Sequence, residues 1–113
     1  MPGTGTIRVI DASALAAIVY DEPAGDQVAE QIRDCGLVAP SLLGYQMANV
    51  CRIKLRRHPL EREALLAALR MPGIAPEILD VDHDAVVKLA AQTGLTTYDA
   101  SYLCSRMASV PNW

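Results

Sequence analysis

The chain has 113 residues and a formal net charge of −3, which favours one compact domain, residues 1–113, over a two-domain enzyme. About half of the residues are apolar (51 %), but there are only four Tyr, one Trp and no Phe, so the core must be mainly aliphatic. The mild acidity argues against a general polyanion binder, because non-specific binding to nucleic acids depends on phosphates neutralised by Lys and Arg.

The cysteines and the apolar stretches indicate the cellular compartment in which we expect the protein to function. Cys35, Cys51 and Cys104 form no CxxC pair, so a reducing cytoplasm is a simpler expectation than a disulfide framework. Residues 1–6 have no basic region followed by an apolar run, as a secretory signal would. Gly, Pro and polar residues interrupt the uncharged stretch 35–51, which makes it poor material for a membrane span.

Short apolar runs alternate with segments of helical spacing along the chain. The expected strands are residues 7–10, 37–39 and 77–81. The expected helices are the run after Ser13, residues 24–34, 42–57 and 60–70, the run between Asp82 and Gly94, and a last helix that ends at Pro111. This alternation is typical of an α/β domain with a parallel sheet.

Residue types at the ends of these runs predict the helix caps. Gly36 and Gly94 are expected to close helices. The expected N-caps are Ser41, Asp82, and Thr96 or Thr97. Because ligands bind beyond the carboxyl ends of parallel strands, chemistry is expected around Asp11, Ser13 and Asp99.

Asp11 and Asp99 each have two interpretations. Asp11 suits the N-cap of the first helix, and Thr96 with Asp99 matches a capping box. The recurrence of acids where strands end and helices begin also suits a hard cation held by oxygen ligands. Mg²⁺ or Mn²⁺ needs few protein carboxylates, because water and substrate phosphates complete its coordination, so a phosphate-bearing substrate is expected.

Three blocks of sequence occur at these junctions. They are residues 9–15, residues 39–43 leading into 48–50, and residues 95–103. Together they resemble the PIN-domain family, and more narrowly the VapC-type ribonuclease toxins of bacterial toxin–antitoxin pairs. The resemblance covers the chain from Ile7 to about Leu103, with the blocks in family order.

The resemblance implies a three-layer α/β/α sandwich with a central parallel sheet, and an acidic pocket that binds Mg²⁺ or Mn²⁺ and hydrolyses RNA. The first and third acids of the family correspond to Asp11 and Asp99, which would be the metal ligands. Ser13 and Asn49 would lie next to these metal ligands and support them without binding the metal themselves. The second family acid, a Glu, corresponds to Gln46, and here the chain departs from the pattern.

A fourth family acid follows a further strand after the last helix. Residues 105–113 contain no acid and no clear strand, so the C-terminal strand is expected to be missing. Gln46 keeps one carbonyl ligand but removes a negative charge, so weak metal binding and low activity are expected. An unpaired sheet edge favours a homodimer, and the family resemblance implies an antitoxin partner.

Gln46 also has a structural interpretation. It shares a helix face with Leu42, Asn49 and Ile53, where two amides near a core satisfy each other. An alternative function is therefore a non-catalytic binding protein on the same fold. A phospho-receiver domain of similar length would need an acidic pair after the first strand and a Lys late in the chain. Here Asp11 is the sole acid after the first strand, and no Lys occurs beyond Lys88.

Four positive charges gather within six residues of the expected helix 42–57. They are Arg52, Lys54, Arg56 and Arg57. Because the whole chain is −3, these four charges leave −7 on the rest. They suit a solvated helix C-terminus, and they also suit contact with RNA or with a partner protein.

Overall fold

A computed structural model describes residues 6–109, which form two compact units. The first unit comprises residues 6–10, 34–42 and 76–109, and it holds the sheet and the last two helices. The second comprises residues 11–33 and 43–75 and is helical. The predicted α/β class with a parallel sheet is confirmed, and the architecture is compatible with an α/β sandwich. The single domain 1–113 stays a prediction.

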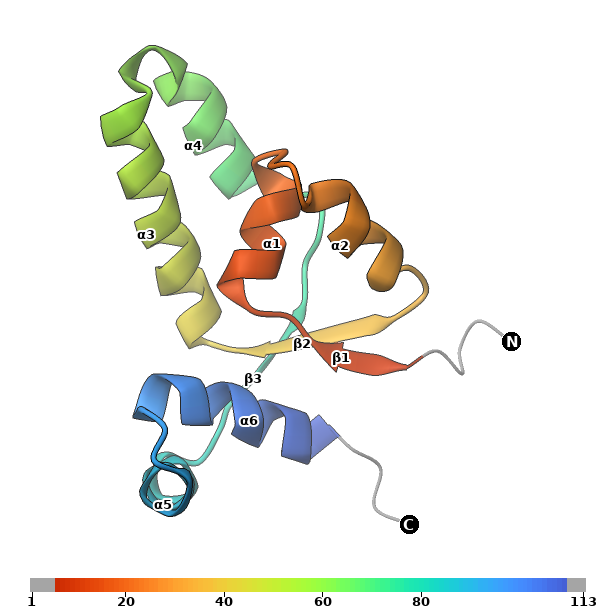
Figure 1. Ribbon diagram of the computed structural model, residues 1–113, viewed down its shortest axis with the longest axis vertical. Helices are drawn as coiled ribbons and strands as arrows, with labels where there is room; N and C mark the ends of the chain where they lie inside the picture. Colours follow the sequence, from red (N-terminus) through yellow and green to blue (C-terminus); the bar gives the residue numbers. More distant parts are fainter. Residues whose placement is uncertain (1–5, 110–113) are drawn as a thin grey trace. The chain divides into compact units, whose positions relative to one another are not determined.

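The sheet of the first unit has three short parallel strands in the order β1-β2-β3. The strands are β1 (Ile7–Val9), β2 (Gly36–Pro40) and β3 (Glu77–Leu79) (Figure 1). Each predicted strand is found, with ends shifted by one or two residues. In the register, Val9 is opposite Val38, and Ala39 is opposite Ile78.

The central position of β2 follows from its composition. Val38, Ala39 and Pro40 are all buried, and a continuous apolar run is typical of a strand covered on both faces. The outer strands carry charged residues instead, namely Arg8 on β1 and Glu77 on β3. Charged side chains are tolerated there because edge strands remain open to water.

Two helices complete the first unit, α5 (His83–Thr93) and α6 (Thr97–Ser109). Helix α6 packs on β1 and β2, and α5 packs on α6. The predicted caps of α5 are confirmed: Asp82 accepts a hydrogen bond from the Asp84 N–H at 3.1 Å, and Gly94 adopts the left-handed conformation with φ of 75°. Small side chains, Ala100 and Ser105, let α6 approach its neighbours closely.

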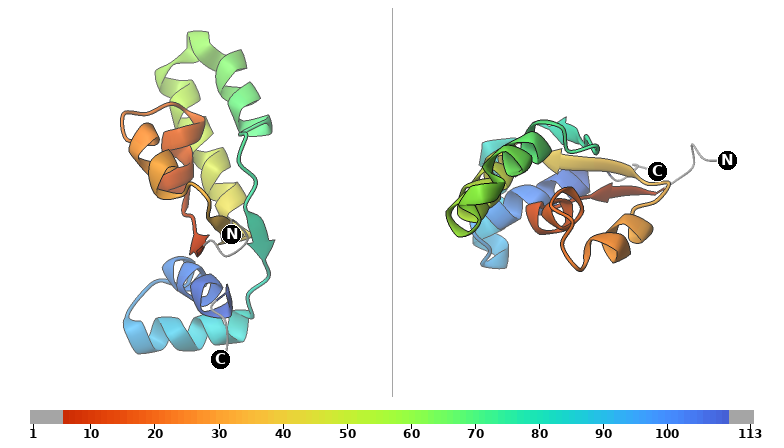
Figure 2. Two further views of the ribbon diagram at one scale, coloured as in Figure 1. Left: turned by 90° about the vertical axis from the view of Figure 1, so that its right-hand side faces the viewer. Right: turned by 90° about the horizontal axis from the view of Figure 1, so that it is seen from above.

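The second unit consists of helices. They are α1 (Ala12–Val19), α2 (Gly25–Gln31), α3 (Leu42–Arg57), the 3₁₀ turn η2 (Pro59–Glu61) and α4 (Arg62–Arg70). Helices α1 and α2 pack side by side (Figures 1 and 2). Their approach is so close at Gly25 that a Cβ there would lie 2.4 Å from the Ala17 carbonyl oxygen.

Two predicted helix boundaries are wrong. The helix expected over 24–34 ends at Gln31 with Ile32 as its C-cap, and Gly36 does not close it but begins β2. Asp34 takes the left-handed conformation instead, with φ of 64°, which short polar side chains tolerate. The helix expected from residue 60 begins with η2, and Pro59 opens this turn, where its fixed φ is suitable and its missing N–H is not needed. The predicted end at Pro111 lies outside the described residues.

None of the helices within residues 6–109 combines the length and the apolar character that crossing a bilayer requires.

Candidate functional site

Asp11 stands at the junction between β1 and α1. It follows Ile10, whose N–H donates to the Val38 carbonyl at 3.0 Å and so extends the ladder by one bond. Its Oδ1 accepts a hydrogen bond from the Ala14 N–H at 2.9 Å, which makes Asp11 the N-cap of α1. The other carboxylate oxygen has no hydrogen-bond partner among residues 6–109. The cap therefore fixes the carboxylate and leaves Oδ2 open to a ligand.

Gln46 lies at the same end of the second unit as Asp11. Helices α1 and α3 run in the same direction (Figure 1), and Tyr20, at the end of α1, contacts Lys54 of α3. Asp11 precedes Tyr20 by nine residues, and Gln46 precedes Lys54 by eight. At 1.5 Å per helical residue, Asp11 and Gln46 each lie roughly 12–14 Å from this contact, measured along their own helices. Asp11 and Gln46, two of the residues predicted to form the metal site, therefore lie at the same end of helices α1 and α3.

The two residues predicted to support the pocket are both exposed. Ser13 lies in the first turn of α1, two residues after Asp11. Asn49 lies one turn after Gln46 on α3, and its Oδ1 accepts a hydrogen bond from Arg52 Nε at 3.2 Å. Asn49 is thus held by its own helix, and its role in a pocket stays a prediction.

Asp99 lies in the first turn of α6, and Thr96 caps that helix. The Thr96 Oγ1 accepts a hydrogen bond from the Asp99 N–H at 3.1 Å, which confirms the expected cap. The reciprocal bond of a capping box, from the Thr96 N–H to the Asp99 carboxylate, is not formed between these two described residues. The carboxylate of Asp99 is exposed and is not used by the helix.

The direction of α6 places Asp99 at the carboxyl end of the sheet. Helix α6 runs in the direction opposite to β2 (Figure 1), so its first turn lies towards the end of that strand. The acid therefore lies where β2 ends, as the rule for parallel sheets predicts.

Asp11 and Asp99 belong to different units, and their convergence stays a prediction. In the part of the chain that the structure describes, no group of three or more His, Cys, Asp and Glu side chains is arranged to hold a metal ion. Each acid taken by itself has an exposed carboxylate, which is the ligand type that a hard cation prefers.

The four cations predicted to contact RNA or a partner lie in different surroundings on α3. Arg56 and Arg57 are exposed in its last turn, where positive charge complements the helix dipole. Arg52 donates to Asn49. The Lys54 ammonium lies 2.7 Å from Glu22 Oε2, so it is held inside the second unit.

Tyr20 is a chemically unusual residue that the sequence does not reveal. Its hydroxyl is buried and has no hydrogen-bond partner among residues 6–109. Burial of the hydroxyl is the main cause that raises the pKa of Tyr20 well above its ordinary value, and the adjacent Cys51 thiol is the second cause. The only trace in the sequence is the spacing of Cys51 and Lys54, which places both on one face of α3.

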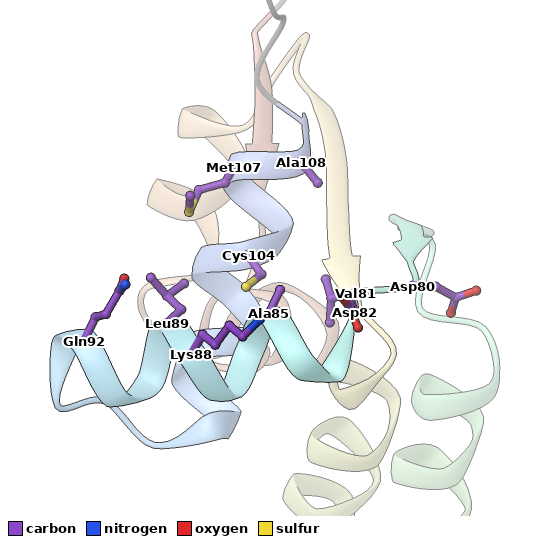
Figure 3. A pocket seen from close by; sticks show the side chains of 10 residues that line it. All are labelled: Asp80, Val81, Asp82, Ala85, Lys88, Leu89, Gln92, Cys104, Met107 and Ala108. Atoms are coloured by element: carbon purple, nitrogen blue, oxygen red, sulfur yellow. The ribbon is translucent and has the colours of Figure 1, made fainter.

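An open cavity of about 450 Å³ lies between α5 and α6 in the first unit (Figure 3). Its lining is mostly apolar, with Leu89, Cys104 and Met107 among the contributors, and Asp82 and Lys88 lie at its rim. Lys88 pairs with Asp84 at 3.0 Å. The sequence did not predict this cavity, because Leu89 and Met107 occur in positions typical of an ordinary buried helix face.

No model of a known protein family matches the chain, and no curated protein and no solved structure matches it at a significant level.

Proposed function

We propose that the chain is a PIN-domain protein of the VapC type, a metal-dependent endoribonuclease that hydrolyses RNA phosphodiester bonds and is weakened by Gln46. The observation that carries this proposal is the placement of Asp11, which follows the first strand of a parallel sheet and keeps one carboxylate oxygen open while the other caps α1. The unused carboxylate of Asp99 at the carboxyl end of the same sheet supports it.

In this proposal Asp11 and Asp99 hold Mg²⁺ or Mn²⁺. When bound, the cation stabilises the charge that develops on the phosphodiester and lowers the pKa of the attacking water. The N-cap bond orients Asp11 before any ligand arrives. Ser13 offers a hydroxyl to the same pocket, and Gln46 contributes length and a carbonyl oxygen without charge.

The proposed partners follow from the same site. Exposed Arg56 and Arg57 neutralise RNA phosphates, while Arg52 and Lys54 are committed to contacts within the second unit. An antitoxin protein holds the toxin inactive in the cytoplasm, and two copies of the chain form a homodimer. None of Cys35, Cys51 and Cys104 forms a disulfide.

A matched pair of N-cap variants tests the role of Asp11. Asp11→Asn keeps an oxygen that caps α1 but removes the charge, so RNA cleavage and Mn²⁺ binding should fall by at least about tenfold while the thermal midpoint stays unchanged. Asp82 caps α5 in the same way, so Asp82→Asn is the control and should leave cleavage unchanged. Equal cleavage by wild type and Asp11→Asn would overturn the proposal.

Gln46→Glu tests the departure from the family pattern. Restoring the negative charge should raise both Mn²⁺ affinity and the rate of cleavage of a single-stranded RNA, because each added carboxylate strengthens binding of a hard cation. Asn49→Asp, one turn further along α3, adds the same charge at an exposed position and should have the smaller effect. A rate that is unchanged by Gln46→Glu would remove Gln46 from the site.

A second candidate is a binding protein on the same fold that no longer cleaves RNA. Gln46 in place of an acid, and the lack of a group of three metal-binding side chains among residues 6–109, favour it. Isothermal titration with Mn²⁺ separates the two candidates. Binding that Asp11→Asn abolishes supports the ribonuclease, whereas no binding by wild type and by Gln46→Glu supports the binding protein.

A further inference from the structure

One side of α3 carries an aromatic ring, an amide and two guanidinium groups in a row. The four residues follow each other at intervals of four, three and four, and residues at these intervals are neighbours on a helix surface. All four are exposed, and we call them the α3 stripe: Tyr45, Asn49, Arg52 and Arg56. The side chains that α3 buries lie on its opposite side, and they are Leu43, Met47 and Cys51.

Tyr45 presents its ring to the surroundings. It is 79 % exposed, more than any other tyrosine among residues 6–109. Its neighbours on one flank of the helix are small, because Gly44 has no side chain and Ala48 has only a methyl group. A Cβ added at Gly44 would have no atom within 4 Å, so the space beside the ring is open. An accessible aromatic ring of this kind is a surface on which a nucleobase stacks.

The guanidinium groups of the stripe are available to anions. Arg52 donates from Nε to the Asn49 Oδ1 at 3.2 Å, which holds its guanidinium on the stripe and leaves both Nη groups to other acceptors. Arg56 makes no hydrogen bond or ion pair with any of residues 6–109. Helix α3 contains no Asp or Glu, although the whole chain is −3. The charge of the stripe therefore complements that of phosphate groups.

The stripe begins at the end of α3 that carries Gln46. Tyr45 directly precedes Gln46, and Arg56 lies eleven residues further on, or roughly 16 Å along the helix. Because Asp11 lies at the same end of α1 and α3, a strand that follows the stripe has one end beside Asp11 and Gln46. Its other end lies at the cationic end of α3.

We propose that the α3 stripe binds single-stranded RNA, with an unpaired base stacked on the Tyr45 ring and the adjoining phosphates bonded to Arg52 and Arg56. This inference rests on the proposed function, because it assigns a binding surface to the RNA substrate of the same site. A base inside a duplex is covered on both faces by its neighbours and is not available to a side chain. Tyr45 therefore makes the chain select unpaired over paired RNA.

Fluorescence anisotropy of a labelled single-stranded oligoribonucleotide tests the proposal on the full chain. Excess EDTA removes divalent cations, so binding is measured without cleavage. Tyr45→Leu removes the ring but keeps an apolar side chain, and it should weaken binding about tenfold. Tyr45→Phe keeps the ring and should bind as wild type does. Tyr98→Leu, at an exposed tyrosine of α6, is the control and should leave binding unchanged.

Two further RNA probes separate stacking from charge attraction. One is a strand of the same length without bases, and the other is a duplex. Tyr45→Leu should not change the binding of either probe, because neither offers an unpaired base. Arg56→Gln should weaken the binding of all three probes and reduce its dependence on salt, whereas Arg70→Gln, at an exposed position of α4, should not.

The loss of binding must depend on the ring and on the base. An equal loss in Tyr45→Leu and Tyr98→Leu would overturn the proposal, and so would an equal loss of Tyr45→Leu on strands with and without bases. Binding of all probes that is unchanged in Arg56→Gln would also overturn it.

These outcomes are distinct from those of the ribonuclease proposal. Cleavage that Asp11→Asn leaves unchanged would overturn the ribonuclease, while a loss of binding in Tyr45→Leu would still support the stripe. Conversely, if Asp11→Asn abolishes cleavage and Tyr45→Leu binds RNA as wild type does, the stripe alone is overturned.

Discussion

The Lys54 ammonium lies 2.7 Å from a carboxylate oxygen of Glu22, and the two side chains are only 23 % and 36 % exposed. Every other ion pair within residues 6–109 that the structure describes is more than half exposed. Lys54 also lies 5.3 Å from the centre of the Tyr20 ring. One cation of α3 therefore holds the segment that follows α1.

A double-mutant cycle of Lys54→Met and Glu22→Gln should reveal this connection. Each single variant leaves one partner of a half-buried pair without its counter-charge, so the coupling energy should be about 0.5–1 kcal/mol. Urea unfolding of the four proteins gives the coupling. The cycle of Lys88→Met and Asp84→Asn, an exposed pair, is the control and should give the smaller value. Equal coupling energies in the two cycles would show that the pair of Lys54 and Glu22 does not hold the segment after α1 to α3.

Tyr20→Phe should change how stability depends on pH. The raised pKa of Tyr20 means that the folded state holds this proton more tightly than the unfolded state does. Its contribution is complete below about pH 10, the ordinary tyrosine value, and is lost as the pH rises towards the folded-state pKa. Wild type should therefore lose stability above pH 10 more steeply than Tyr20→Phe.

Urea midpoints at pH 8 and above pH 10 measure this difference. At pH 8 the Phe variant should be as stable as wild type or slightly more stable, because the buried hydroxyl has no hydrogen-bond partner among residues 6–109 to lose. Tyr45→Phe, at an exposed tyrosine, is the control and should follow wild type. Parallel pH profiles of wild type and Tyr20→Phe would contradict the prediction.

Two glycine-to-alanine variants should have opposite effects on stability. At Gly25 the added Cβ would lie 2.4 Å from the Ala17 carbonyl oxygen, so α1 and α2 must separate, at a cost of roughly 2–3 kcal/mol. At Gly44 of α3 no atom lies within 4 Å of the added Cβ, and alanine should stabilise by about 0.5 kcal/mol. Chemical denaturation compares the two, and a stable Gly25→Ala would refute the close approach.

Thr96→Val should remove the cap of α6. The lost hydrogen bond to the Asp99 N–H should cost about 1 kcal/mol in the free energy of unfolding. Thr97→Val changes a neighbouring threonine of the same size that makes no such bond, and it should cost less. If Asp99 holds a metal, Thr96→Val should also weaken Mn²⁺ binding, because the first turn of α6 positions that carboxylate.

Local signals in the sequence predict much of the fold. Helix α3 is found over the expected residues 42–57, because the strand ends at Pro40 and cations gather in the last turn of the helix. Asp82 and Gly94 bound α5 as expected, since an acceptor at the N-cap and a residue free to adopt positive φ are local requirements. The prediction that Gly36 closes helix α2 was wrong, because Asp34, two residues earlier, adopts the positive φ that the chain needs after this helix.

Features that depend on distant residues could not be predicted in this way. The contact between Tyr20 and Lys54 joins residues that are more than thirty positions apart in the sequence, and no spacing in the sequence predicts it. Arg8 and Arg106 lie near opposite ends of the described chain, and yet both line one hollow of the first unit. Asp11 and Asp99 were found from their positions at strand ends and helix starts, and their convergence still rests on the family resemblance.

The interleaving of the two units has a consequence for how the chain folds during synthesis. The first unit draws on three separated stretches of sequence, and its covering helix α6 is made after both of the strands on which it packs. As the chain leaves the ribosome, α1 and α2 can pair at once, but β1 and β2 must wait for α6 to cover them. The apolar strand β2 therefore stays without its covering helix until α6 has left the ribosome.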